Sequence, residues 1–79
     1  MLEMRPGCEA CDTDLAPDRA GAFVCSFECT FCTPCTEAME HICPNCGGEL
    51  VRRPTRTGDA LRRNPASRTR IHRPPTPGR

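Results

Sequence analysis

The chain has 79 residues, 37% of them hydrophobic, with three phenylalanines and neither Trp nor Tyr. It can therefore bury too little core to enclose a substrate. It also has no apolar run of the ~18 residues that a membrane span needs. The net charge of +1 divides along the chain, because residues 1–50 carry nine acids against two arginines (−7) and residues 51–79 carry nine arginines against Asp59 (+8). Eight cysteines, about one residue in ten, can replace the missing core with metal ligands or cross-links.

The first predicted element is a strand over residues 21–26. This segment, Gly-Ala-Phe-Val-Cys-Ser, contains the aromatic and β-branched residues that favour strands. Residues 27–31 should return beside it as the second arm of a short hairpin.

A two-turn helix over about 34–41 is predicted next. Thr33 is a plausible N-cap, and Pro34 fits the first helical turn because its ring fixes the backbone and it needs no donor there. After the helix, Gly47 and Gly48 let the chain turn in a conformation barred to other residues. Residues 49–51 can then pair as a last short strand.

The chain after Pro54 differs in composition from what precedes it. All eight cysteines lie between residues 8 and 46, whereas five of the nine prolines lie in 51–79. We predict a cysteine-rich domain over 1–53 and a disordered Arg/Pro-rich tail over 54–79, since low hydrophobicity and high charge cannot offset the entropy of ordering. One helical turn at 60–63 would be stopped by Pro65.

The cysteines form four close pairs along the domain. The members of each pair are two or three residues apart: Cys8 and Cys11, Cys25 and Cys29, Cys32 and Cys35, Cys43 and Cys46. Two thiolates at this spacing can take two corners of a tetrahedron from one tight turn, and two such turns complete a closed Zn(Cys)4 site. The eight cysteines therefore predict two structural zinc ions, with no position open for water or substrate.

Three other uses of the cysteines are weaker. The N-terminal residues lack the apolar stretch of a secretory signal, so we expect a cytoplasmic protein, in which cysteines bind metal more often than they form disulfides. An iron–sulfur cluster on the dense run from Cys25 to Cys35 would leave the outer pairs to form a separate site, and the proline that follows such runs is absent. A set of reactive thiols, used for redox or zinc sensing, remains an alternative function.

Spacing does not decide which pairs share a metal. Sequential pairing would join the first pair to the second, and interleaved pairing would join the first to the third and the second to the fourth. Only Thr30 and Phe31 separate the second pair from the third, so both schemes are sterically open.

The order of ligands resembles a RING-type cross-brace with cysteine at all eight positions. Two ligands, a longer loop, four ligands close together, a shorter loop and a final Cys-Pro-x-Cys follow one another. The resemblance implies the interleaved scheme and a small metal-stabilised α+β domain of the RING-like or treble-clef kind.

Residues 1 to about 54 also resemble a bacterial family catalogued as domain of unknown function 1272. The resemblance rests on three blocks, Leu-Glu-Met-Arg-Pro at 2–6, Cys-Ser-Phe-Glu-Cys-Thr-Phe-Cys at 25–32 and Cys-Pro-Asn-Cys-Gly-Gly-Glu-Leu-Val-Arg-Arg-Pro at 43–54. It implies a zinc-binding domain in a bacterial cell and brings no established activity. The tail beyond Pro54 lies outside this resemblance.

The residues argue against a RING-type ubiquitin ligase, so we expect no enzymatic activity. Such ligases usually present an apolar residue between the first two ligands, where this chain has Glu9 and Ala10, and a basic residue past the last ligand, where it has Gly47. A fold alone does not carry a function, so the RING-type resemblance does not by itself imply ligase activity. We expect a protein-interaction module instead.

Charge indicates where other partners could bind. Two Zn(Cys)4 centres would add −2 each and take the first fifty residues from −7 to about −11, a surface that repels phosphate. Nonspecific nucleic-acid binding would therefore use the Arg-rich tail, whereas the alternative is that the tail pairs with its own acidic domain or has no partner.

Four further residues have simple structural interpretations. Phe23, Phe27 and Phe31 recur every four residues, and we expect them in the core rather than as a platform for stacking bases. His41 lies two residues before Cys43 and could serve as a ligand, but the eight cysteines already satisfy two metals, so we expect a partly exposed residue at the helix end.

Overall fold

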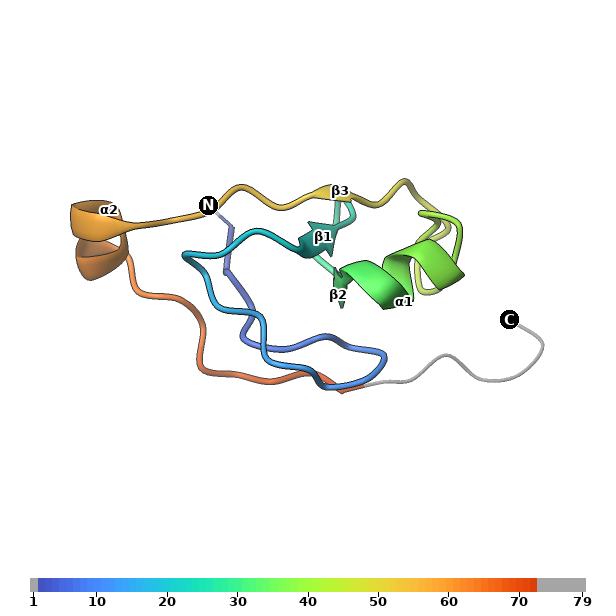
Figure 1. Ribbon diagram of the computed structural model, residues 1–79, viewed down its shortest axis with the longest axis horizontal. Helices are drawn as coiled ribbons and strands as arrows, with labels where there is room; N and C mark the ends of the chain where they lie inside the picture. The colour runs from blue at the N-terminus through green and yellow to red at the C-terminus, as the bar shows by residue number, and fades with distance from the viewer. Residues whose placement is uncertain (1, 73–79) are drawn as a thin grey trace.

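The computed structural model describes residues 2–72 and has an α+β architecture (Figure 1). In chain order the elements are β1 (Ala22–Val24), β2 (Thr30–Cys32), α1 (Thr33–Ala38), β3 (Val51–Arg52) and α2 (Gly58–Arg63). Every element is at most six residues long. Turns and loops therefore make up most of the domain.

The three strands form one antiparallel sheet in the order β2-β1-β3. Phe23 in β1 is opposite Phe31 on one side and Arg52 on the other. The β1–β2 pairing confirms the predicted hairpin, but β1 stops at Val24 because Cys25 already begins a tight turn, in which its carbonyl accepts a hydrogen bond from Glu28 at 3.0 Å.

Helix α1 begins directly after β2 and is shorter than predicted. Its N-cap is Cys32, and the Thr33 hydroxyl instead donates to the Gly21 carbonyl at 2.8 Å, so the predicted N-cap at Thr33 is wrong. The helix ends at Ala38 rather than near residue 41, because Glu40 and His41 adopt φ values of 56° and 62°, outside the helical region.

The core lies between the sheet, α1 and the N-terminal loop. Phe31 is fully buried, and Leu50 and Leu15 pack in the same cluster with six further buried residues, among them five cysteines. Phe23 is partly buried, but Phe27 is 72% exposed, so its predicted place in the core is wrong. Phe27 lies in the turn between β1 and β2.

The residues after β3 run along the N-terminal loop. Figure 1 shows α2 at one end of the molecule and the following segment returning beside residues 2–14. The backbone of Arg56 donates to the Pro17 carbonyl, and that of Ser67 to the Glu3 carbonyl, both at 2.8 Å. Helix α2 ends before Pro65, where the sequence places a stop.

The predicted tail is described only in part. Residues 54–72 contain α2 and these backbone contacts, whereas 73–79 lie outside the described residues. Disorder over 54–79 stays a prediction. Within 2–72, no helix has both the length and the apolar character that crossing a membrane requires.

Candidate metal centres

The first cysteine cluster brings together the first and third pairs. The sulfur atoms of Cys8, Cys11, Cys32 and Cys35 all lie within 4.8 Å of one another. Those of Cys11 and Cys32 are 3.6 Å apart, close to the ~3.8 Å that separates sulfurs around a tetrahedral zinc with Zn–S bonds of ~2.3 Å. The donor set and its spacing therefore fit one Zn²⁺ ion.

Two different segments supply these four thiols. Cys8 and Cys11 lie in a turn closed by a hydrogen bond from the Asp12 backbone to the Cys8 carbonyl at 2.8 Å. Cys32 is the last residue of β2, and Cys35 lies in the first turn of α1. The strand-to-helix junction thus presents one pair to the pair in the N-terminal loop.

The second cluster combines cysteines of the second and fourth pairs. The sulfur atoms of Cys25, Cys43 and Cys46 lie within 4.8 Å of one another. The turn at 43–46 is closed by the Gly47 backbone, which donates to the Cys43 carbonyl at 2.8 Å. Gly47 has φ +76°, which confirms the predicted need for glycine at that position, whereas Gly48 is not among the residues with positive φ.

Cys29 is the one predicted ligand outside these two groups. Among the described residues, its sulfur is not within 4.8 Å of all three sulfurs of the second cluster. Burial raises the pKa of its thiol, Asn45 opposes this through a hydrogen bond, and Cys25 and Glu9 raise it further. The Cys25 backbone donates to the Cys29 carbonyl at 3.2 Å, so the two cysteines of this pair lie next to each other.

The grouping of the sulfur atoms is interleaved rather than sequential. The first pair meets the third, and Cys25 of the second pair meets the fourth. Cysteine spacing leaves both groupings open, and the RING-type resemblance implies the interleaved one. All eight cysteines are free thiols, with no disulfide among them.

The thiols differ in how readily they lose a proton. A hydrogen bond with the Thr13 hydroxyl at 3.0 Å lowers the pKa of Cys11 to about 6. Burial raises the pKa of Cys43 to about 12, and it also raises the pKa values of Cys32 and Cys35. Metal ligation requires thiolates, so a metal that binds these buried sulfurs displaces their protons.

Two charged residues of the domain are buried, and sequence reasoning missed both. Glu9 is fully buried between Cys8 and Cys11, and its carboxylate forms an ion pair with Arg5 at 2.9 Å. Arg53 is 5% exposed. The Cys-x2-Cys spacing alone gave no signal for the burial of Glu9, because its neighbour Ala10 in the same spacing is only partly buried.

The guanidinium of Arg53 holds three backbone carbonyls of the N-terminal loop. It donates to Arg5 at 2.9 Å, to Leu15 at 3.2 Å and to Ala16 at 3.3 Å. Its backbone also donates to the Ala22 carbonyl at 2.8 Å. Arg53 therefore closes the domain by linking the segment after β3 to the loop before β1.

His41 belongs to neither cysteine cluster of the described residues. Its ring contacts Phe23 edge-on, with 5.5 Å between ring centroids and an interplanar angle of 77°. His41 is exposed and lies beyond the end of α1 at Ala38, rather than at the end of a helix that reaches about residue 41.

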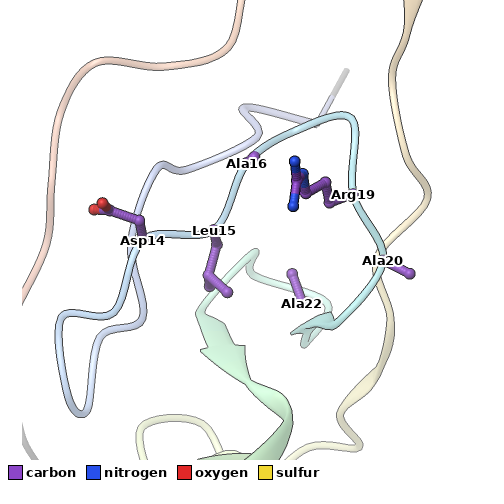
Figure 2. A pocket seen from close by; sticks show the side chains of 6 residues that line it. All are labelled: Asp14, Leu15, Ala16, Arg19, Ala20 and Ala22. Carbon is purple, nitrogen blue, oxygen red and sulfur yellow. The ribbon is translucent and has the colours of Figure 1, made fainter.

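A shallow hollow lies away from the cysteines, inside the loop that precedes β1. It has a volume of about 440 Å³ and is lined by Asp14, Leu15, Ala16, Arg19, Ala20 and Ala22. Figure 2 shows Leu15 and Arg19 directed toward the enclosed space and Asp14 directed away from it. With no cysteine or histidine in its lining, the hollow offers no thiol or imidazole chemistry.

Comparisons with known proteins agree with the resemblance of the N-terminal residues. The family model described as "Protein of unknown function (DUF1272)" matches residues 1–56. An uncharacterized protein of Rhizobium meliloti (strain 1021) is 55% identical over 75 residues, which cover 94% of this chain and 89% of the relative. That alignment also takes in most of the residues after 56. No solved structure matches.

Proposed function

Since the chain belongs to the DUF1272 family of proteins of unknown function, we propose its function from its own geometry: it binds two zinc ions in structural Zn(Cys)4 sites. The observation that carries the proposal is the convergence of four sulfur atoms from two distant segments within 4.8 Å. Thiolate donors in a tetrahedron are typical of structural zinc.

The ligands of the first ion are Cys8, Cys11, Cys32 and Cys35. The ligands of the second ion are Cys25, Cys29, Cys43 and Cys46. We assign Cys29 to the second set because it forms the second pair with Cys25, whose backbone donates to the Cys29 carbonyl at 3.2 Å. Four thiolates at each ion leave no position for a water or a substrate, so the sites stabilise the fold rather than catalyse a reaction.

The arrangement supports a cross-braced, RING-like or treble-clef domain. The interleaved grouping of sulfurs, the β1–β2 hairpin and the helix that begins at the third pair are the features that favour it. Free thiols suit a reducing compartment such as the cytoplasm.

The domain acts, in this proposal, as a non-enzymatic protein-interaction module. Among the described residues of the domain, three large apolar side chains are exposed: Phe27 at 72%, Ile42 at 50% and Val51 at 49%. Exposed aromatic and aliphatic side chains are candidate anchors for a protein partner, since burying them on binding is favourable.

Nucleic-acid binding through the Arg-rich tail is the second candidate. Arg63 and Arg68 are exposed, and within residues 2–72 neither forms an ion pair or a side-chain hydrogen bond. Their guanidinium groups are therefore free to contact phosphates, and such contacts would weaken with salt.

Native mass spectrometry of the full chain tests the zinc proposal. We expect two zinc ions per chain and a colourless sample. Replacement by Co²⁺ should give the intense d–d and sulfur-to-metal charge-transfer bands of tetrahedral thiolate sites, and anomalous scattering should place each ion among its four sulfurs. A brown, iron-containing sample, or sulfurs bonded to one another, would overturn the proposal.

A further inference from the structure

The carboxylate of Glu9 lies between the two cysteine clusters. The residue is 0% exposed, and it sits inside the turn that presents Cys8 and Cys11. A carboxylate in such a position loses its hydration and is costly unless several donors replace the lost water. The donors of Glu9 therefore show what its burial achieves.

Both carboxylate oxygens accept hydrogen bonds. Oε2 accepts from the Arg5 guanidinium and from the Thr30 backbone, each at 2.9 Å. Oε1 accepts from the Asn45 side-chain amide at 3.3 Å. The Glu9 backbone also donates to the Thr30 carbonyl at 2.9 Å.

These donors come from segments that belong to different clusters. Thr30 lies between Cys29 and Cys32, where the chain passes from the second cysteine pair to the third. Asn45 lies inside the turn that presents Cys43 and Cys46 to the second cluster. One side chain in the turn of the first cluster is thus bonded to the turn of the second.

Asn45 lies within the turn of the fourth cysteine pair, one residue before Cys46. Its side-chain amide donates to the Glu9 carboxylate. The orientation of this turn therefore depends in part on the carboxylate.

Electrostatics alone does not explain a carboxylate at this position. Each filled Zn(Cys)4 centre carries a formal −2, so an anion between two such centres is repelled by both. Arg5 forms an ion pair with Glu9 at 2.9 Å, which offsets part of this repulsion. What the carboxylate provides, and an apolar side chain would not, is a set of directed bonds from one cluster to the other.

We propose that Glu9 is a positioning residue that couples the two metal sites. A metal in the first site fixes the turn at 8–11 and so fixes the carboxylate, which holds Asn45 and the turn at 43–46 in the geometry that the second metal needs. The two ions then bind with positive cooperativity, and linkage makes the effect reciprocal. The inference rests on the proposed function, that both clusters hold zinc.

Glu9→Gln removes one half of the link and retains the size of the side chain. The Gln oxygen can still accept from Arg5 and Thr30, but its NH2 group is a donor, so Asn45 either loses this bond or turns its own oxygen toward position 9 and leaves its wild-type orientation. Asn45→Ala breaks the same link from the other side and leaves the Arg5 and Thr30 bonds intact. Glu37→Gln is the matched control, because Glu37 is exposed in α1 and its substitution removes the same charge.

The experiment is a stepwise zinc titration of the metal-free full chain, followed by native mass spectrometry. At half saturation two equal independent sites leave about half of the molecules with a single ion. For the wild type and E37Q we expect a one-ion population several-fold below that value. For E9Q and N45A the one-ion population should rise toward the value for independent sites. The double variant should show no further rise, because both substitutions remove the same interaction.

The outcomes separate this inference from the proposed function. A wild type that binds two ions with the one-ion population of independent sites would overturn the coupling and leave the zinc proposal standing. E9Q and N45A titrations that match the wild type would have the same consequence. A wild type that fails to bind two ions would overturn both. If E9Q does not fold with zinc, the N45A titration decides alone.

Discussion

At the scale of single residues, Arg53 is a buried cation that forms no ion pair with another residue of 2–72. Its guanidinium donates to the carbonyls of Arg5, Leu15 and Ala16 instead. Burial lowers the pKa of Arg53, and the nearby Arg56 lowers it further, but a guanidinium stays protonated in proteins. The three carbonyls therefore provide the stabilisation that a counter-ion would otherwise give.

Replacing Arg53 should destabilise the domain strongly. Arg53→Ala leaves three carbonyls without their donor, and we expect a loss of about 3 kcal/mol in the free energy of unfolding, since hydrogen bonds to charged groups contribute ~1.5–3 kcal/mol each and are not additive. Denaturant unfolding at saturating zinc measures it.

The adjacent Arg52 provides the control for this measurement. It lies in β3 and is exposed, so Arg52→Ala should change the free energy of unfolding by no more than about 0.5 kcal/mol. Equal losses in the two variants would show that the carbonyl contacts of Arg53 do not stabilise the fold. Arg53→Lys should recover little, because one ammonium lacks the planar fork that reaches several carbonyls at once.

Burial of individual residues was the hardest property to predict from the sequence. Composition counts Glu9 as a surface acid and Arg53 with the basic tail, although both are buried. Phe27 was expected in the core and is exposed. A count of residue types gives the sign of a charge or the size of an apolar group, whereas burial depends on the turn that carries the residue.

At the scale of elements, the sequence predicted which helix and strands form better than where they end. The hairpin, the helix after Thr33 and a pairing segment near 49–51 follow from local patterns, and the structure has all three. Their ends differ because the cysteine turns interrupt them. Cys25 stops β1, and the left-handed backbone at Glu40 and His41 stops α1.

Removing metal should unfold these short elements together. An isolated two-stranded hairpin is marginal in water, and so is a helix shorter than ~12 residues, whereas structural zinc contributes ~10–16 kcal/mol per site in small peptides. We expect a chelator to abolish the far-ultraviolet circular dichroism of the sheet and α1, and added zinc to restore it.

The control for chelation is the same chelator saturated with zinc beforehand. It should leave the spectrum unchanged, which separates loss of metal from other effects of the reagent. A metal-free sample that keeps the spectrum of the untreated protein would contradict the prediction, and the core around Phe31 would then suffice for folding.

At the scale of the whole molecule, the tail returns to the acidic domain. The Arg70 guanidinium donates to the Asp12 carboxylate at 3.0 Å and to the Asp12 backbone carbonyl at 2.7 Å. It also forms an ion pair with Asp14 at 2.9 Å. The guanidinium lies over Gly7, where an added Cβ would come within 2.5 Å of it. The absence of a side chain at Gly7 makes this close approach available.

Asp12→Asn with Asp14→Asn should release the tail. Exposed ion pairs are weak and screened by salt, so we expect trypsin to cleave after Arg63 and Arg68 several-fold faster in the variant at low salt. The difference should vanish at high salt. If the tail binds nucleic acid, affinity for an oligonucleotide should also rise, because Arg70 is no longer engaged.

Asp18→Asn is the control for the released tail. Asp18 is exposed and forms no ion pair within residues 2–72. Cleavage at the wild-type rate in the Asp12 and Asp14 variant would show that these contacts do not restrain the tail, and an unchanged oligonucleotide affinity would remove the support for competition between the two partners.

Long-range organisation was only partly predictable. The excess of acid before residue 50 and of arginine after it indicated that the tail could pair with its own domain, but spacing could not identify Asp12 and Asp14 as the partners. Likewise, close spacing identified four cysteine pairs, but two residues between Cys29 and Cys32 allow either grouping. Contacts between distant segments depend on the path of the chain, which no local pattern records.

The interleaved grouping also affects what happens when the backbone is cut. Residues 12–24 connect the first cysteine pair to the second, while the first pair shares its cluster with Cys32 and Cys35. With metal bound, a protease that cuts inside 12–24 would produce two fragments still joined through one ion. The nicked protein would then come apart only when that ion is withdrawn.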